Sequence, residues 1–554
     1  MTETTTDPAA HPNPSTALAR VVADELAARG VRVVVISPGS RSGALAIAAA
    51  GHPELDTRVV IDERSAAFHG LGVSRASGRP VAVVATSGTA PANFFPAVVE
   101  ADMSCVPLLV VSADRPGELR GIGANQTIDQ VELFGTKVRA YAGIEAPEPD
   151  VDGNAGWRRT IAGLVQRSQG PRPGPVHLNV AFREPTVPVG DDGRTKSPPY
   201  PFATPRIEAP QSLVPEQLTV EPALVTPDRT LVIAGDGEYD REALMVETAR
   251  LGWPVLATAL SGLRGEKVVG SYHLMLARGV PRELVPEAVI AIGAIGPDPV
   301  LEELFATADH RVRIDAWGRS IDPGRNSTAR YVTDPVQMIA GVASGAEPSW
   351  SGAWLETDAA SREKVSAALS SETRMTGAKI AVALNDIDWG ALVVASSLPI
   401  REVDAHLRRS GPIHANRGAS GIDGFVSTSL GVASVLPRTL ALAGDLSFLH
   451  DGNGFVHDGE VDLTMVVVDN SGGGLFDSLP QARFAPDYER LFVTDPHRDL
   501  GELARFHGAR VGEADSSETL VRLVGGALDR PGLDVIIVRV DRTDDLEVRA
   551  QLGG

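Results

Sequence analysis

Short apolar runs alternate with helix-like stretches along most of the chain. An uninterrupted apolar run is typical of a strand buried on both faces, as in a parallel sheet between two layers of helices. The runs fall into three groups, so we predict an α/β protein with three doubly wound parallel sheets. The predicted strands are Val31–Ile36, Arg58–Ile61, Val81–Ala85 and Leu108–Val111 in the first group, Leu231–Ala234, Pro254–Ala257, Val289–Ile292 and Val312–Asp315 in the second, and Leu392–Ala395, Thr439–Ala443, Leu463–Val468 and Asp534–Val540 in the third.

The first predicted helix runs from Thr16 to Arg29, with Ser15 as its N-cap and Gly30 as its terminator. Leu18, Val21, Val22 and Leu26 form its apolar stripe.

Changes in composition indicate where the domains begin and end. Residues 1–14 are polar, and we expect a disordered tail there. The first domain is predicted over residues 15–186, followed over 187–224 by a linker with many prolines and charges. The second domain covers 225–345 and the third 352–554, with a loose stretch around Pro348 between them.

The bulk composition excludes several classes of protein. The 554 residues have room for three domains of roughly 150 residues each. A formal charge of −20 argues against a nucleic-acid partner, which needs a basic surface. The single cysteine, Cys105, cannot form an intrachain disulfide, and we expect a buried, inert thiol in a reducing cytoplasm. No apolar run nears the ~18 residues of a membrane span, and the N-terminus lacks the features of a signal peptide.

Polar residues follow two strands of the third group. Asp445 follows the strand that ends at Ala443, and Asn470 comes 25 residues later, after the strand Leu463–Val468. Ligands of open parallel sheets lie beyond the carboxyl ends of the strands. A carboxylate and an amide there suit a hard divalent cation that also binds a ligand's phosphates. The alternative is a metal-free turn.

A second Gly-Asp, in Gly235-Asp236-Gly237, follows the strand Leu231–Ala234. No asparagine occurs between Asn179 and Asn326, so no partner ligand follows it, and we interpret it as a plain turn.

The stretch from Gly444 to Asn470 resembles the thiamine-diphosphate motif, which begins with Gly-Asp and ends with Asn. The resemblance implies Mg²⁺ or Mn²⁺ held by Asp445, Asn470 and the Gly472 carbonyl. It also places Gly444, Leu446 and Ser447 at the cofactor, although Leu446 departs from the usual glycine.

Eight segments, in one order, resemble the 2-succinyl-5-enolpyruvyl-6-hydroxy-3-cyclohexene-1-carboxylate synthase family of menaquinone biosynthesis. The resemblance is strong over the first and third domains and weaker over Val187–Ser351. The segments are SPGSRSGALA (37–46), IDERSAAFHGLG (61–72), TSGTAPANFFPAVVEA (86–101), ADRPGEL (113–119), GANQTIDQ (123–130), SLPIRE (397–402), ANRGASGIDGFVSTSLG (415–431) and GDLSFLHDGNG (444–454).

The resemblance implies decarboxylation of 2-oxoglutarate and addition of the succinyl carbanion equivalent to isochorismate. Arginine suits such anionic substrates because its guanidinium binds carboxylates in a bidentate manner. The implied residues are Ser40, Arg41 and Gln126 for isochorismate, Ser397 and Arg401 for the 2-oxoglutarate chain, Arg417 near the reacting carboxylates, and Arg115 on a substrate. Taken singly, each arginine is also compatible with a surface ion pair.

Glu63 follows a predicted strand and, singly, is typical of a solvated carboxylate at a helix start. The resemblance implies that it hydrogen-bonds the cofactor's aminopyrimidine N1′, where a carboxylate promotes proton removal from the thiazolium. Ile422 would support the bent cofactor, and Leu475 and Phe476 would line the substrate cavity, with ordinary core packing as the alternative. The segment after Phe476 is either a lid or a surface loop.

The resemblance further implies a pyrimidine-binding first domain and a pyrophosphate-binding third domain, with active sites shared in a homodimer or homotetramer. The stretch 292–304 lacks the basic pair that some family members carry, and Arg278 and Arg282 are the candidate substitutes. Rival interpretations are an acetolactate-synthase-like enzyme, an inactive scaffold or sensor, and a nicotinamide dehydrogenase. The last lacks a fitting GxGxxG motif.

Overall fold

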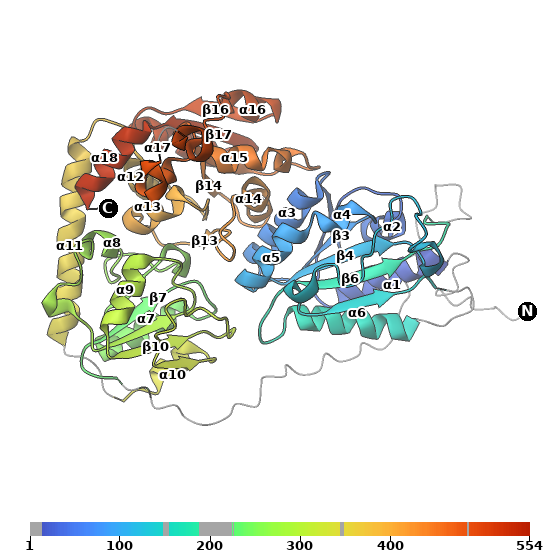
Figure 1. Cartoon of the computed structure of the whole chain (residues 1–554), viewed down its shortest axis with the longest axis horizontal. Coiled ribbons are helices and arrows are strands. Elements are labelled where there is room, and N and C mark those ends of the chain that lie inside the picture. Colours follow the sequence, from blue (N-terminus) through green and yellow to red (C-terminus); the bar gives the residue numbers. More distant parts are fainter. Residues whose placement is uncertain are drawn as a thin grey trace, which may run out of the picture. The chain divides into compact units, whose positions relative to one another are not determined.

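The computed structural model describes residues 14–147, 154–187, 224, 226–343, 348–484 and 487–553. Three sheets form in this part of the chain (Figure 1), and the paired strands in each of them run parallel. Helices alternate with the strands in all three. The predicted α/β class with three doubly wound parallel sheets is therefore confirmed.

The first sheet has the strand order β2-β1-β3-β4-β6-β5. Its strands are β1 Val33–Ile36, β2 Asp56–Val59, β3 Val81–Ala85, β4 Leu108–Asp114, β5 Tyr141–Ile144 and β6 Val176–Ala181. Its helices are α1 Pro14–Ala28, α2 Gly43–Ala50, α3 Glu63–Ser77, α4 Thr89–Ala92, α5 Phe95–Ser104 and α6 Asn154–Ser168.

Helices cover both faces of this sheet because its strands are apolar on both sides. One core layer joins the sheet to α1, α2 and α6, and a separate layer joins it to α3 and α5. The sheet also contains a buried polar group of its own, in which the Ser112 hydroxyl of β4 lies 2.7 Å from His177 Nε2 and donates to Asn179 Oδ1 of β6 at 2.7 Å. Cys105, which ends α5, is buried as predicted.

The second sheet has the order β11-β10-β9-β7-β8. Its strands are β7 Thr230–Ala234, β8 Val255–Ala257, β9 Ala288–Ile292, β10 His310–Ile314 and β11 Ala329–Tyr331. Its helices are α7 Arg241–Leu251, α8 Tyr272–Met275, α9 Pro299–Thr307, α10 Pro335–Ala340 and α11 Pro348–Ser371.

The third sheet has the order β13-β12-β14-β15-β17-β16. Its strands are β12 Ala391–Val394, β13 Ile413–His414, β14 Thr439–Gly444, β15 Leu463–Asp469, β16 Arg510–Glu513 and β17 Leu533–Arg539. The helices of this part of the sequence are α12 Gly377–Ala383, α13 Leu398–His406, α14 Phe425–Ala433, α15 Asp445–His450, α16 Leu500–Phe506, α17 Ser517–Leu528 and α18 Arg542–Leu552.

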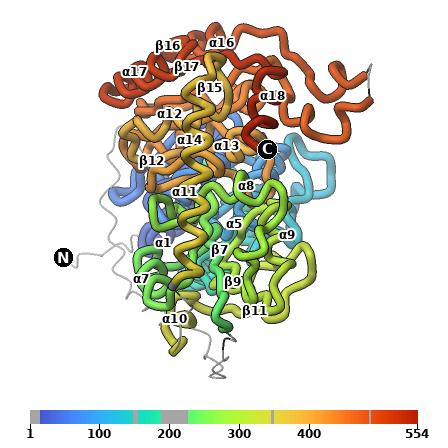
Figure 2. The backbone as a smooth tube through the Cα atoms, turned by 90° about the vertical axis from the view of Figure 1, so that its left-hand side faces the viewer, coloured from blue at the N-terminus to red at the C-terminus, as the bar shows by residue number. Residues whose placement is uncertain are grey.

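The long helix α11 connects the second and third sheets. Trp350 and Trp354 pack into the core of the second sheet, while Val365 and Leu369 pack against α12 and α18. Figure 2 shows α11 running past the second sheet toward α18. In the part of the chain that the structure describes, no helix combines the length and apolarity needed to cross a membrane.

The chain forms two compact units. The first contains the first sheet together with two segments from much later in the sequence, Gly418–Val435 and Asp451–Glu460. The second contains the second and third sheets. Helix α14, in the first of these segments, packs along α3. The start of α3 also contacts the second segment, through a hydrogen bond from Ser65 to Asp451 that spans 386 positions.

All twelve predicted strands correspond to strands of the structure, with ends that differ by up to three residues. The structure adds β5, β6, β11, β13 and β16. Ser15 was predicted as a helix cap, and this is wrong: α1 begins at Pro14, and the Ser15 hydroxyl donates instead to the Arg183 carbonyl at 2.8 Å.

The predicted domain boundaries remain predictions. Of the expected tail, residues 1–13 lie outside the described residues, as does the expected linker 187–224 apart from its two end residues. Helix α11 begins within the stretch expected to separate the second and third domains.

Candidate functional site

Asp445 and Asn470 lie at the carboxyl ends of two neighbouring strands. β14 and β15 are adjacent, with Gly444 opposite Val468, so the next residues of each strand emerge at the same edge of the sheet. The Asp445 carboxylate accepts a hydrogen bond from the Gly472 N–H at 2.7 Å and another from the Leu446 N–H at 2.7 Å. The structure thus brings Asp445 and the turn after Asn470 together.

The electrostatics of this strand end fit a bound cation. Asp445 is only 3% exposed, and burial raises the pKa of its carboxyl to about 6, although backbone N–H groups oppose the shift. The Oδ1 atom of Asn470 is buried and has no hydrogen-bond partner among the described residues. A divalent cation would neutralise the carboxylate and give the amide oxygen a partner.

The described residues contain no cluster of three or more His, Cys, Asp or Glu side chains that could hold a metal ion. A cation at Asp445 would therefore not be held by a cluster of protein carboxylates or imidazoles alone. The amide of Asn470, a backbone carbonyl and the phosphates of a ligand would complete its coordination.

The glycines after Asn470 serve the packing of the chain itself. A Cβ on Gly472 would overlap the Val493 carbonyl, and Gly472 has a positive φ of 118°. The Gly473 N–H donates to that same carbonyl at 2.6 Å. Space for a ligand is left at Gly444 instead, where an added Cβ would meet nothing within 4 Å. Next to Asp445, Leu446 is half-buried and Ser447 is buried.

The segment after Phe476 is held by polar contacts. Asp477 accepts from the Tyr488 hydroxyl at 2.6 Å, and Arg542 of α18 forms ion pairs with Asp477 at 3.2 Å and with Glu489 at 3.0 Å. Phe476 is half-buried, with its ring 5.6 Å from that of Phe492, and Leu475 is also half-buried. These contacts are compatible with both a lid and a surface loop.

Glu63 is the first residue of α3. The preceding Asp62 caps the helix, with its carboxylate accepting from the Ser65 N–H at 3.3 Å. Glu63 itself is half-buried and forms no hydrogen bond or ion pair with another described residue. Its carboxylate is therefore available to a ligand of the first unit.

Arg41, Arg115 and Gln126 gather at the ends of β1 and β4. The Arg115 guanidinium donates to the hydroxyl of Ser87, and that hydroxyl donates to the Gln126 carbonyl at 3.0 Å. Burial, and then the charge of Arg41, lower the pKa of Arg115. Two cations that repel each other in this way would gain from an anionic ligand.

The same residues also make internal contacts. Arg41 donates to the Phe182 carbonyl at 3.0 Å and forms an ion pair with Glu184 at 3.1 Å. The Gln126 amide donates to the Ser87 carbonyl at 3.2 Å, while its backbone has a positive φ of 53°. Ser40 is exposed beside them.

Sequence reasoning missed Ser87 and Gln130 as parts of this cluster. Ser87 is fully buried and bridges Arg115 and Gln126. Gln130 is 1% exposed, and its amide oxygen accepts from the Gly88 N–H at 3.1 Å. Both residues belong to the segments 86–101 and 123–130 quoted above, so their position in those segments was the available signal.

The predicted residues of the third sheet follow two neighbouring strands, β12 and β13. Ser397 comes after β12 with a positive φ of 79° and caps α13. Arg401, one turn along this helix, is exposed and donates to the Ser397 carbonyl. Arg417 follows β13 and is half-buried. Ile422, in the first unit, is 37% exposed, so it is not a core residue of that unit.

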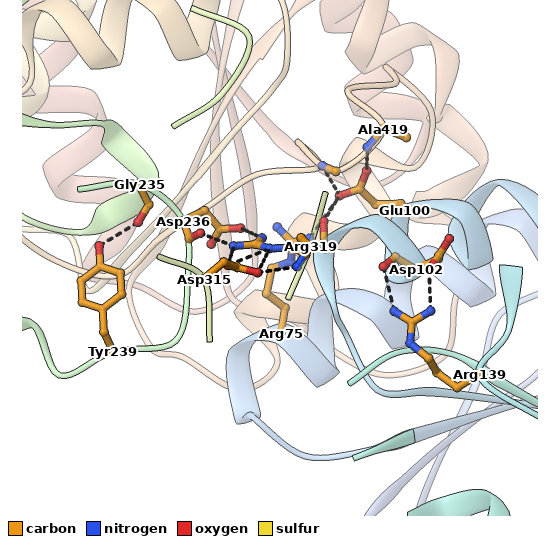
Figure 3. Close-up of polar contacts among 12 residues, drawn as sticks. Arg75, Glu100, Asp102, Arg139, Gly235, Asp236, Tyr239, Asp315, Arg319 and Ala419 are labelled. Carbon is orange, nitrogen blue, oxygen red and sulfur yellow. Dashed lines mark hydrogen bonds and ion pairs between the residues drawn. The ribbon is translucent and has the colours of Figure 1, made fainter. Parts of the chain in front are cut away.

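The second sheet has a Gly-Asp strand end of a different kind. Asp236 exchanges two backbone hydrogen bonds with Ala294, and a Cβ on Gly235 would overlap the Ala294 carbonyl. The Arg319 guanidinium forms ion pairs with Asp315 at 2.7 Å and with Asp236 at 3.4 Å, as Figure 3 shows. The side chain of Arg319 thus neutralises this strand end from within the chain.

The proposed substitutes for the missing basic pair lie on the surface. Arg278 and Arg282 are both exposed in the second unit. Within the stretch 292–304, Asp298 caps α9 and forms an ion pair with His273 at 3.1 Å.

Comparison with known proteins relates this geometry to a family. Residues 16–133 match the profile of the family described as "Thiamine pyrophosphate enzyme, N-terminal TPP binding domain". The 2-succinyl-5-enolpyruvyl-6-hydroxy-3-cyclohexene-1-carboxylate synthase of Thermobifida fusca is 39% identical over 557 aligned positions, which cover 98% of each chain. The synthase of Saccharopolyspora erythraea is 38% identical, over 96% of this chain and 97% of its own, and that of Acaryochloris marina is 35% identical, over 96% of each.

These similarities extend over nearly the whole length of both partners and include the second sheet, where the sequence motifs are weakest. The chain therefore belongs to the 2-succinyl-5-enolpyruvyl-6-hydroxy-3-cyclohexene-1-carboxylate synthase family.

Proposed function

We propose that this protein catalyses the thiamine-diphosphate-dependent decarboxylation of 2-oxoglutarate and the addition of the succinyl unit to isochorismate. The product is 2-succinyl-5-enolpyruvyl-6-hydroxy-3-cyclohexene-1-carboxylate, an intermediate of menaquinone biosynthesis. Family membership over nearly the full length supports this reaction. The match of residues 16–133 to a TPP-binding domain supports the cofactor.

The observation that carries the proposal is the pair of strand ends at Asp445 and Asn470. Among the residues that the structure describes, the buried carboxylate at one strand end has no cationic partner, and the buried amide oxygen at the next has no hydrogen-bond partner. Asp445, Asn470 and the Gly472 carbonyl would hold Mg²⁺ or Mn²⁺ there, and the open space at Gly444 would admit the diphosphate, with Leu446 and Ser447 beside it.

When bound, thiamine diphosphate supplies the nucleophilic carbon and the electron sink for the decarboxylation. Glu63 would hydrogen-bond the aminopyrimidine N1′, since its half-buried carboxylate has no partner in the part of the chain that the structure describes. Ile422, 37% exposed in its own unit, would pack against the bound cofactor.

The two substrates are anions, and the arginines would bind them. Arg41 and Arg115, with Gln126 and Ser40 beside them, would hold the isochorismate carboxylates, because two repelling guanidinium groups gain from an anion between them. Ser397 and Arg401 would hold the 2-oxoglutarate chain, and Arg417 would lie near the reacting carboxylates. Leu475 and Phe476 would exclude water from this space.

We also propose that the active protein is a homodimer or homotetramer in the cytoplasm. In that arrangement Glu63 of one subunit and Asp445 of another would serve the same cofactor, so a monomer would be inactive.

A two-substrate assay tests the proposal. Purified protein with thiamine diphosphate and Mg²⁺ should consume isochorismate only when 2-oxoglutarate is also present. If 2-oxoglutarate is decarboxylated and isochorismate survives, the acceptor assignment is wrong. If neither substrate reacts although the cofactor binds, the synthase assignment fails, and a related carboligase becomes the better hypothesis. Absence of cofactor binding would favour a scaffold or sensor.

A further inference from the structure

The residues on either side of Glu63 are tied to one short segment from the third part of the sequence, residues 451–458. Asp62 accepts a hydrogen bond from the Asn453 amide at 2.9 Å. The Ser65 hydroxyl donates to the Asp451 carboxylate at 3.2 Å, and Arg64 lies 3.8 Å from the same carboxylate. Three of the first four residues of this turn thus contact the segment, and Glu63 alone does not.

The strand that leads to Glu63 is held by the same segment. Val60 forms an isolated antiparallel bridge with His457. The Asp458 N–H donates to the Val59 carbonyl at 2.9 Å, and the Val59 N–H donates back to the Asp458 carboxylate. The chain is therefore fixed both before and after Glu63 by residues 451–458.

Asp451 anchors this arrangement in the core of the first unit. Its side chain is fully buried, and its second carboxylate oxygen accepts from the Ser427 N–H in the first turn of α14 at 2.7 Å. One carboxylate thus joins the N-terminal turns of two helices, α3 and α14.

The two helices can move little against each other. A Cβ on Gly72 of α3 would overlap the Thr428 carbonyl of α14, and one on Gly431 of α14 would overlap the His69 carbonyl of α3. Such close backbone approach means that a displacement of the α14 N-terminus would be transmitted to the first turn of α3.

We propose that Asp451 is a positioning residue for Glu63, which it acts on through Ser65 and Arg64 without touching the cofactor. This inference rests on the proposed function, because it takes Glu63 to be the group at N1′. Glu63 has no hydrogen-bond or ion-pair partner among the described residues, so the position of its carboxylate depends on how its backbone is held. Misplacement of a catalytic group by about 1 Å can lower the reaction rate roughly 100-fold.

The test measures hydrogen–deuterium exchange at C2 of enzyme-bound thiamine diphosphate, together with cofactor affinity by calorimetry. Glu63→Gln should slow the exchange by about 10²- to 10⁴-fold. Asp451→Asn should slow it by about 10- to 100-fold, because the amide lacks the charge that faces Arg64, and an amide oxygen that keeps the Ser427 N–H leaves its NH2 group toward the Ser65 hydroxyl, which would have to reverse its hydrogen bond. Affinity for the cofactor with Mg²⁺ should change by much less.

A double-mutant comparison separates positioning from general loss of structure. In the Glu63→Gln background, Asp451→Asn should have no further effect on the exchange rate, because the group it positions has already been removed. A merely structural role would lower the rate in both backgrounds. Ser65→Ala, which deletes one hydroxyl and leaves the Ser427 contact intact, should give a smaller effect of the same kind even if Asp451→Asn folds poorly.

Asp358→Asn is the matched control. Asp358 is also fully buried, accepts a backbone hydrogen bond at 2.7 Å from Ser271, and pairs with Arg362 at 3.0 Å, but it lies in α11 of the other unit. It should leave C2 exchange unchanged.

Exchange at the wild-type rate in Asp451→Asn and Ser65→Ala, with Glu63→Gln impaired, would overturn the inference and leave the proposed function intact. Failure of the wild type to bind or activate the cofactor would instead overturn the proposed function.

Discussion

Two strand ends of this protein carry the same dipeptide, Gly-Asp, and compensate the aspartate charge in different ways. At the end of β7, Asp236 faces the Arg319 guanidinium at 3.4 Å and is bonded through its backbone to Ala294. At the end of β14, Asp445 is buried, accepts only backbone hydrogen bonds, and forms no ion pair with a described Lys or Arg. The first site is neutralised by the chain, and the second is not.

The difference distinguishes a structural strand end from one built for a ligand. A buried carboxylate without a cation is costly, and proteins retain such groups mainly where a ligand or metal supplies the missing charge. The amide oxygen of Asn470, which has no hydrogen-bond partner in the described part of the chain, has the same interpretation. At Asp236 no such deficit exists, since Arg319 fills the space where a cation would bind.

The largest expected effect comes from removing the carboxylate at the second site. Asp445→Asn should lower the synthase activity by at least about 100-fold, because the proposed metal ion would lose the carboxylate of Asp445 as a ligand. Thermal unfolding with and without thiamine diphosphate and Mg²⁺ gives an independent measurement, since a ligand that binds the folded state raises its stability. The rise in melting temperature should be present in the wild type and absent in Asp445→Asn.

The Asp236→Asn variant should show the same rise in melting temperature with thiamine diphosphate and Mg²⁺ as the wild type. A ligand-induced shift that survives in Asp445→Asn would place the metal elsewhere and end the contrast between the two strand ends.

Much of this contrast could be predicted from the sequence. The apolar runs before Asp445, Asn470 and Asp236 predicted the strands, and the absence of an asparagine after Asp236 separated the two dipeptides. Edge strands were harder: β13 has two residues, and β16 reads RVGE with exposed ends, so neither has the apolar run of a strand buried on both faces.

Long-range partners could not be predicted. Arg319 lies 83 positions after Asp236, and Asp451 lies 386 positions after Ser65. Tertiary packing brings these residues together, and the local sequence pattern around each residue does not predict it. The segment 86–101 pointed to the neighbourhood of Ser87, but its contacts with Arg115 and Gln126 could not be predicted, since a buried serine hydroxyl has no signature of its own.

The second prediction concerns removal of the Arg319 guanidinium, which neutralises Asp236. Arg319→Met should lower the free energy of unfolding by about 3–5 kcal/mol, because the buried Asp315 carboxylate would lose its cation. Urea unfolding followed by the fluorescence of the six tryptophans, one of which, Trp317, lies under the Arg319 guanidinium, measures this. The activity of the folded fraction should not change. A loss of cofactor binding in this variant would show that the two strand ends are not independent.

A third carboxylate, Glu402, has a cationic partner that offsets its burial only in part. It is buried and pairs with Arg549 at 2.9 Å, yet burial raises the pKa of its carboxyl from 4.5 to about 7, because the ion pair offsets only part of the desolvation. Between pH 4.5 and about pH 7, the Glu402 carboxyl is protonated in the folded chain, whereas in the unfolded chain it has released this proton. This contribution to stability is complete below the unfolded pKa and is lost as the pH rises through about 7.

Glu402→Gln should remove that pH dependence. Relative to this variant, the wild type should lose up to about 3 kcal/mol of unfolding free energy between pH ~5 and pH ~8, as measured by urea unfolding at intermediate values. Arg549→Met serves as the control, since without its cation the carboxyl pKa should rise further and shift the loss to higher pH. Equal slopes for wild type and Glu402→Gln would mean that the ion pair compensates the charge fully, as Arg319 does at Asp236.

The smallest effect is expected from Asp236→Asn. The side chain of Asp236 is 37% exposed, so its ion pair with Arg319 is screened by water, and the loss of unfolding free energy should stay under about 1 kcal/mol. Its backbone bridge to Ala294 does not involve the carboxylate, and Arg319 keeps Asp315 as a partner. Unfolding in urea measures the change, with Arg319→Met as the upper reference. A loss as large as that of Arg319→Met would mean that the Asp236 carboxylate is needed to hold the guanidinium in place, and that a Gly-Asp strand end can be a core structural element in its own right.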